Sequence, residues 1–423
     1  MNFNLLHHHA RTIRAAALNN RGTIKGFLNL SSVRGTQMLL GLVTTYFLAR
    51  ALTVEQYGEY QFVLTIIGLL TIFTLTEFKN TVMQSVARGY TGSYRKILIY
   101  PFLGSLAGSL ILLLLAFWQG FHIGHKDLMA CFFIASAAFP FMHGLTLWKA
   151  FRIGEKNFAG LAKMEIATGI LTTAAIVSIT QFYGGQYIGV ILAFMGFPAL
   201  ANLFMLYRLR GLLRDETPAE EGIIEHGGKS SLYSAVSVAS NYADKLLLFF
   251  FLSPTALALF AVGDRLSGLL KTSAADISSA LAPKFAETRS YTRKLDRIMK
   301  IFCILFGCLM VAFAFTLLPW AIRLLYGPAF AEAIPYAQAL VCSAAIGNLA
   351  TLQFRYIRSK LDTENFRKIT VYTSLFRVLI SAILIPLMGL TGAVISAFAY
   401  RISLSFYTNR LIHKTYGATH ELP

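Results

Sequence analysis

The sequence predicts an all-α polytopic membrane protein with twelve transmembrane helices in two parallel six-helix halves. Of its 423 residues, 56% are hydrophobic and 14% are charged, and the mean hydropathy is +0.58, far above that of soluble domains. Apolar runs of about 20 residues, the length that crosses a bilayer, recur along the chain. Lys and Arg collect in alternate connections between these runs, as the positive-inside rule requires.

The apolar runs place the twelve helices along the chain. We expect them at 27–50, 57–86, 98–119, 128–151, 158–182, 186–208, 229–252, 256–284, 300–323, 334–357, 366–387 and 390–411. Cations collect in the segments 11–25, 88–96, 149–163, 208–229, 284–300, 355–368 and 410–414. The connections on the opposite side hold only Arg50, Lys126 and Arg323. Both termini are therefore predicted to be cytoplasmic.

One acidic linker, 211–228, divides the chain into a first bundle (27–210) and a second bundle (229–412), flanked by cytoplasmic tails at 1–26 and 413–423. A short repeat supports the division, because Leu52–Tyr60 aligns with Leu252–Phe260 at the first outer turn of each half. Halves with an even number of helices keep the same orientation, so a binding site is expected between them.

Seven cations fall within the predicted spans, against four acids. A charge near the middle of a bilayer costs at least about 2.5 kcal/mol, so such residues usually face a cavity and mark a transport path. On the helix wheel of 256–284 the charges share one polar arc, and 229–252 has a similar stripe that includes Asn241. The cations are Arg34, Lys79, Lys245, Arg265, Lys271, Arg377 and Arg401, and the acids are Glu77, Asp244, Asp264 and Asp276. The excess of cations predicts an anionic cargo.

The roles expected of these residues differ with depth and charge. We assign binding of the anionic cargo to Arg34, Lys245, Arg265, Lys271 and Arg377. Lys79 and Arg401 lie nearer the cytoplasmic ends and could reach the head groups, so they and Asn241 are secondary candidates. The four acids are candidates for ion or proton coupling. The alternative is that cations and acids only pair to hold helices together, but four acids would leave three cations over.

Other classes of function lack their signatures. There is no Walker A sequence, G-x-S-x-G or H-E-x-x-H motif, and the outer connections are short, so we expect neither an enzyme nor a cofactor. Because the basic residues are spread over short loops, we also expect no nucleic-acid binding. The four cysteines lie in apolar runs without zinc spacing, and His7–His9 belong to the basic tail, so no metal site is predicted.

Several segments resemble the polysaccharide flippases of the Wzx type, in the multidrug/oligosaccharidyl-lipid/polysaccharide (MOP) exporter superfamily. They are Leu48–Tyr60 (LARALTVEQYGEY), Tyr242–Leu246 (YADKL), Phe260–Leu266 (FAVGDRL), Ala282–Glu287 (APKFAE), Leu325–Gly327 (LYG) and Leu384–Ala393 (LIPLMGLTGA). The resemblance implies a V-shaped fold like that of MATE transporters, in the bacterial inner membrane. The implied activity is the flipping of undecaprenyl-diphosphate-linked oligosaccharides by alternating access.

The family's cationic cavity would map onto Arg34, Arg265 and Lys271. The resemblance also implies a membrane lipid and a polyprenyl-diphosphate-linked glycan as partners, with polysaccharide polymerase and glycosyltransferases in the same pathway and H⁺ or Na⁺ as coupling ion. Related lipid II flippases have fourteen helices, and the extra pair is missing here. The alternatives are an ion-coupled exporter of another anionic or neutral small molecule on the same fold, and a glycan polymerase or ligase.

The topology gives the first testable prediction. Alkaline phosphatase fused after residue 184 or 254 should be active, because these connections are predicted to lie outside, and fusions after residue 220 or at the C-terminus should be inactive. Activity of the fusion at residue 220 would contradict the division into two parallel halves.

Overall fold

The computed structural model describes residues 32–184, 186–214, 217–287, 291, 293–359 and 363–416, with side chains described except at 272–287, 294, 355, 358, 359, 363 and 416. Both predicted tails fall wholly or mostly outside these residues. After a helix over 32–51 come α2 (Val54–Leu70), α3 (Phe78–Ala87), α4 (Ser93–Trp118), α5 (Lys126–Phe139), α6 (Leu147–Gly154), α7 (Phe158–Phe182), α8 (Tyr187–Arg208), α9 (Ile223–Phe251), α10 (Pro254–Glu287), α11 (Arg293–Thr316), α12 (Leu318–Leu325), α13 (Ala333–Ile346), α14 (Asn348–Ser359) and α15 (Thr363–Tyr416).

The all-α prediction is confirmed, whereas the number of uninterrupted helices differs from twelve. The second predicted span is broken after Thr74 by Leu75, whose φ is 50°, and the tenth is bent by 41° between α13 and α14. The last two predicted spans, 366–387 and 390–411, both lie in α15 and meet at Gly389, whose non-helical backbone (φ 62°) divides α15 into two helical parts where the sequence predicts the boundary. Seven helices in the described part of the chain are long and apolar enough to span a membrane, or eight if the bent pair counts as one.

The charged helices explain why fewer spans are recognised by length and composition. Neither α9 nor α10 is among the seven. Within eight residues α10 carries Asp264, Arg265 and Lys271, which lower its hydropathy. The helix over 32–51, which carries Arg34, is not among the seven either, whereas α15 passes the test although it carries Arg377 and Arg401.

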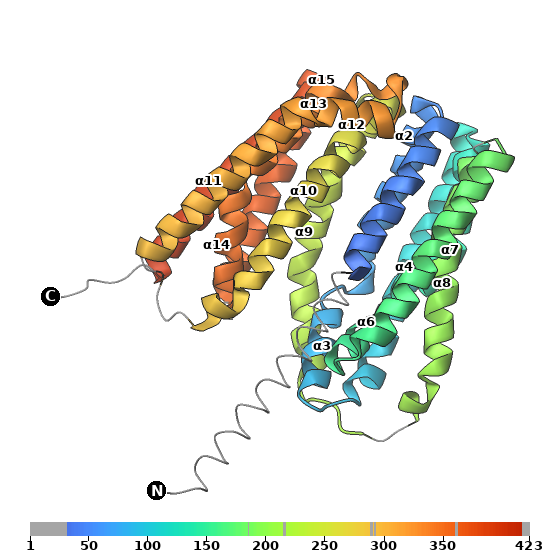
Figure 1. Cartoon of the computed structure of the whole chain (residues 1–423). Coiled ribbons are helices and arrows are strands. Elements are labelled where there is room, and N and C mark those ends of the chain that lie inside the picture. The colour runs from blue at the N-terminus through green and yellow to red at the C-terminus, as the bar shows by residue number, and fades with distance from the viewer. Residues whose placement is uncertain are drawn as a thin grey trace, which may run out of the picture.

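Figure 1 shows the helices in two slanted groups, with α2 to α8 in one and α9 to α15 in the other. In the middle, α2 packs against α9 and α10. The lower end of α10 in this view lies apart from α3 and α6, while the lower end of α9 stays beside α3. The exact domain boundaries stay a prediction.

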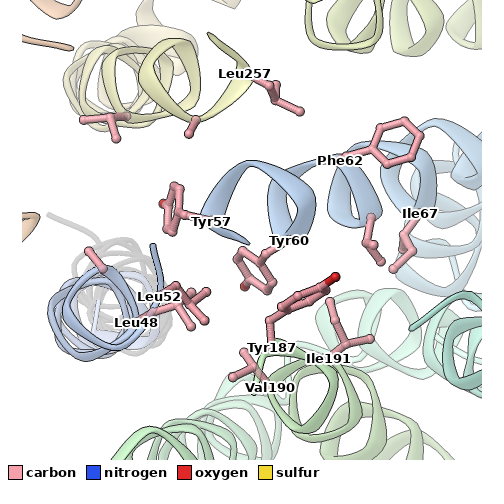
Figure 2. Close-up of a cluster of buried hydrophobic side chains, with 14 of the residues drawn as sticks. Leu48, Leu52, Tyr57, Tyr60, Phe62, Ile67, Tyr187, Val190, Ile191 and Leu257 are labelled. Carbon is pink, nitrogen blue, oxygen red and sulfur yellow. The ribbon is translucent and has the colours of Figure 1, made fainter. Parts of the chain in front are cut away.

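At one end, which we call the outer end, the two groups share a single hydrophobic core. This core joins Leu48, Tyr57 and Tyr60 of the first group to Leu257 and Phe330 of the second, and Figure 2 shows α2 side chains between those of the first helix, α8 and α10. The α2–α10 contact is so close that a Cβ on Gly58 would lie 2.0 Å from the carbonyl oxygen of Pro254. Only glycine fits there.

The outer turns of α2 and α10 are built alike. Thr53 accepts a hydrogen bond from the Gln56 backbone N–H at 3.2 Å, and Ser253 accepts one from Ala256 at 3.1 Å. Both helices therefore begin at a hydroxyl N-cap, which satisfies a free amide of the first turn. The two caps lie within the predicted repeat of Leu52–Tyr60 and Leu252–Phe260.

At the opposite, inner end each group has its own core. One core packs Phe78, Trp148 and Phe151 with Ile223 at the start of α9, and the other packs Tyr356 and Ile369 with Ile412. The groups therefore share one core at the outer end, whereas at the inner end only the start of α9 joins the core of the first group.

The linker before α9 is fixed to the first group. Arg88 Nη2 lies 2.7 Å from both carboxylate oxygens of Glu220, and the Glu220 backbone N–H donates to Ser93 Oγ at 3.0 Å. The hydrogen bond from Arg88 lowers the pKa of Glu220 below its usual value. Movement between the groups must therefore begin beyond this segment.

Arg50 links the two groups directly at the outer end. It stacks on Tyr46, with the guanidinium carbon 3.8 Å from the ring centroid. Its Nη2 and Nη1 donate to the carbonyls of Leu324 and Leu325 at 3.0 and 3.3 Å, at the C-terminus of α12. A cation at a helix C-terminus satisfies free carbonyls and complements the helix dipole.

We expect Arg50→Ala to loosen the outer closure. Each lost hydrogen bond contributes on the order of 1 kcal/mol, so the open population should rise several-fold. The measurement is labelling of a cysteine introduced at the buried Ala258 by a membrane-impermeant maleimide. Arg323→Ala is the matched control, because Arg323 is an exposed arginine on α12. Equal labelling rates in wild type and Arg50→Ala, or equal increases in both variants, would contradict the role of Arg50.

Candidate functional site

The most buried charge of the predicted site is Asp244 on α9, with 1% of its side chain exposed. Its Oδ2 accepts hydrogen bonds from Nε and Nη2 of Arg377 at 3.1 and 2.7 Å. Its Oδ1 accepts one from Ser381 at 2.6 Å, and the Ser381 hydroxyl oxygen lies 3.1 Å from that of Ser396. A buried carboxylate is stable only when it is paired and hydrogen-bonded in this way.

Arg377 is largely committed to this pair. Its Nη1 donates to Asn241 Oδ1 at 2.8 Å, and the guanidinium carbon lies 5.1 Å from the centroid of the Tyr400 ring. The secondary candidate Asn241 therefore orients Arg377. Arg377 and Asp244 together add no net charge, and their clearest role is to hold α15 against α9.

Asp264 on α10 sits between two ammonium groups. Its Oδ2 lies 2.9 Å from Lys245 Nζ, and its Oδ1 lies 3.9 Å from Lys271 Nζ. The exposed fractions of the three side chains are 32% for Asp264, 20% for Lys245 and 31% for Lys271. The Asp264 carboxylate thus lies between two partly exposed cations. Together Asp264, Lys245 and Lys271 carry a net charge of one positive unit.

Arg265 is the exposed cation of α10. Its Nη2 donates to the carbonyl of Gly41 on the first helix at 3.2 Å, which joins the two groups. It also interacts electrostatically with Tyr57, Tyr60 and Tyr326, which belong to the outer core. Arg265 therefore lies where the outer closure ends.

Of the other predicted residues, Arg401 lies beside Arg377 on α15, and Glu77, Arg34 and Lys79 lie on the first group of helices. The Arg401 guanidinium lies 5.2 Å from the Tyr400 ring centroid. Glu77 accepts hydrogen bonds from Ser234 at 2.9 Å and Asn80 at 2.7 Å, so it joins α3 to α9. Arg34 is exposed on the first helix, and Lys79 lies on α3. The side chain of Asp276 lies outside the described residues.

The described side chains of α9, α10 and α15 therefore bring together Lys245, Arg265, Lys271, Arg377 and Arg401 with the acids Asp244 and Asp264. Five cations against two carboxylates leave an excess of three positive charges. The sequence did not single out Ser396 and Tyr400, since a lone hydroxyl or ring in an apolar helix gives no signal.

The comparisons with known proteins agree with this fold. The family described as polysaccharide biosynthesis protein matches residues 23–289. No curated protein matches the sequence at a significant level.

Three solved structures illustrate the structural similarity. A lipid II flippase MurJ in an inward closed conformation has a TM-score of 0.70 and 14% identity, over 90% of this chain and 87% of that one. A MATE family transporter of the MOP superfamily scores 0.67 in an inward-facing conformation, at 12% identity over 91% of this chain and 96% of that one. A MATE family transporter of the MOP superfamily in an outward-facing conformation has a TM-score of 0.61 and 14% identity, over 92% of this chain and 96% of that one.

These identities establish the fold and leave the cargo open. The family match covers more than half of the chain, and the helices are those of a multi-pass membrane protein. The chain belongs to the polysaccharide biosynthesis protein family and has the fold of MOP-superfamily transporters.

Proposed function

We propose that this protein flips oligosaccharides linked to undecaprenyl diphosphate from the cytoplasmic to the outer leaflet of the bacterial inner membrane. The observation that carries the proposal is the excess of cations among the described site residues, Lys245, Arg265, Lys271, Arg377 and Arg401 against Asp244 and Asp264, in a family of polysaccharide biosynthesis. Cations in a membrane need anionic partners, and a diphosphate linkage supplies two negative charges.

Arg265, Lys245 and Lys271 are the proposed diphosphate ligands. All three are accessible, whereas Arg377 is held by Asp244. A guanidinium offers two parallel N–H donors to phosphate oxygens, and an ammonium offers a point charge. Because Asp264 already contacts both lysines, a bound phosphate would compete with it for them.

The conformation of the structure suits loading from the inner end. The shared core and Arg50 close the outer end, while separate cores keep the groups apart at the inner end. With the predicted orientation, this is the state of an alternating-access cycle that receives cargo from the cytoplasm. Opening of the outer end would then release it to the outer leaflet.

Replacement of Arg265 tests the diphosphate site. Arg265→Ala should reduce flipping of the lipid-linked glycan in proteoliposomes at least about tenfold, because a charge-assisted hydrogen bond contributes about 1.5–3 kcal/mol. Arg265→Lys should restore part of the rate, since the charge returns without the fork. Arg95→Ala, at an exposed arginine of α4, is the control. Normal flipping by Arg265→Ala would remove the central residue from the proposal.

Asp264 is the proposed coupling carboxylate. When phosphate binds Lys245 and Lys271, Asp264 loses its partners and takes up a proton more readily, so proton and cargo binding favour each other. An imposed pH gradient should therefore change the flipping rate, and Asp264→Asn should abolish that response. If neither a pH gradient nor a sodium gradient changes the flipping rate of the wild-type protein, Asp264 has no coupling role. Consumption of the flipped product would then be the driving force.

A further inference from the structure

A second group of basic side chains lies at the inner half of the first group of helices. It comprises Lys79 on α3, His143 before α6 and Lys149 on α6, with Glu165 of α7 as the acid. Lys79 interacts electrostatically with Lys149 and Glu165, and His143 interacts with both lysines. Three basic groups thus share one carboxylate.

The contacts of this cluster leave donors without partners. Lys149 Nζ lies 2.6 Å from Glu165 Oε1, and Gln37 donates to Glu165 Oε2 at 3.0 Å. The buried Nε2 of His143 has no hydrogen-bond partner. Among the described residues, the Lys79 ammonium makes no ion pair or hydrogen bond. An unpaired ammonium inside a membrane protein is costly unless a ligand supplies the charge.

We propose that Lys79, His143 and Lys149 form a second anion subsite that binds a carboxylate on the glycan of the cargo. The proposal rests on the proposed function, and it names the substrate class as an acidic, uronate-containing oligosaccharide. Glu165 shows that the site accommodates a carboxylate, because it already binds Lys149 and Gln37 as an internal substitute. A cargo carboxylate would accept from Lys79 and from neutral His143 through Nε2–H, and would compete for Lys149.

The first helix places this subsite beside the diphosphate site. Gln37, which contacts Glu165, lies one helical turn, about 6 Å along the axis, from Gly41, whose carbonyl accepts the hydrogen bond of Arg265. A sugar next to the diphosphate would therefore pass close to the cluster. The Lys149 side chain is 37% exposed, so the cluster can be reached from the side of Lys149.

The test uses the full-length protein in detergent, titrated with a disaccharide that contains glucuronic acid and with its carboxyl-reduced neutral counterpart. Wild type should bind the acidic disaccharide at least about tenfold more tightly, the value expected for a charge-assisted hydrogen bond. Lys79→Gln should remove this preference, and Lys79→Arg should retain it. Lys163→Gln, at an exposed lysine of α7, should behave as wild type.

A second variant should act in the opposite direction. Glu165→Gln keeps a partner for Gln37 but frees Lys149, so the acidic disaccharide should bind several-fold more tightly. Equal affinity for both disaccharides in wild type, a preference that survives in Lys79→Gln, or weaker binding by Glu165→Gln would each overturn the proposal. These titrations measure binding and not flipping. A failure of the carboxylate subsite can therefore be told apart from a failure of the proposed diphosphate site, which the flipping rate of Arg265→Ala tests.

Discussion

The rest of the structure depends on the electrostatic cost of placing cations within membrane-spanning helices. An ammonium or guanidinium has little hydration there, so it must be paired, solvated in a cavity or neutralised by cargo. The protein uses the first solution for Arg377, which is held by the buried Asp244. Arg265 and Lys271 are more accessible, and Lys245 shares the partly exposed carboxylate of Asp264 with Lys271. The difference between these two solutions separates the residue that supports the site from those proposed to bind cargo.

The hydrophobic cores place the accessible cations next to the closed outer end. Above Arg265 the aromatic side chains of Tyr57 and Tyr326 belong to the core shared by both groups. Toward the inner end the cores are separate, so the groups contact one another mainly through α9. Apolar side chains on one side of Arg265 lower the local dielectric constant, which strengthens the attraction of Arg265 for an anion.

Much of the fold could be predicted from hydropathy, because a bilayer imposes a length and a polarity on every span. The predicted segments fall on helices, and the charged arc of α10 does carry Asp264, Arg265 and Lys271. The break at Leu75 could not be predicted, since it depends on tertiary packing, whereas the predicted boundary between 387 and 390 coincides with the kink at Gly389. The sequence also contains no indication of which acid pairs with which cation. Nothing in the spacing of Asp244 and Arg377, which are 133 residues apart, indicates that they bind each other while Lys245 next in sequence binds Asp264.

The helix α9 belongs to both groups of helices. Its first residue, Ile223, is part of the inner core of the first group, and its Leu248 is part of a core of the second group with Ile385. If the groups tilt as bodies, α9 must bend between these points. That stretch contains Ser231, Ser234, Ser237 and Ser240, and Ser240 Oγ donates to the carbonyl of Ser237 at 2.9 Å. Such side-chain bonds compete with the helical ladder, so this serine-rich stretch is where α9 can bend most easily.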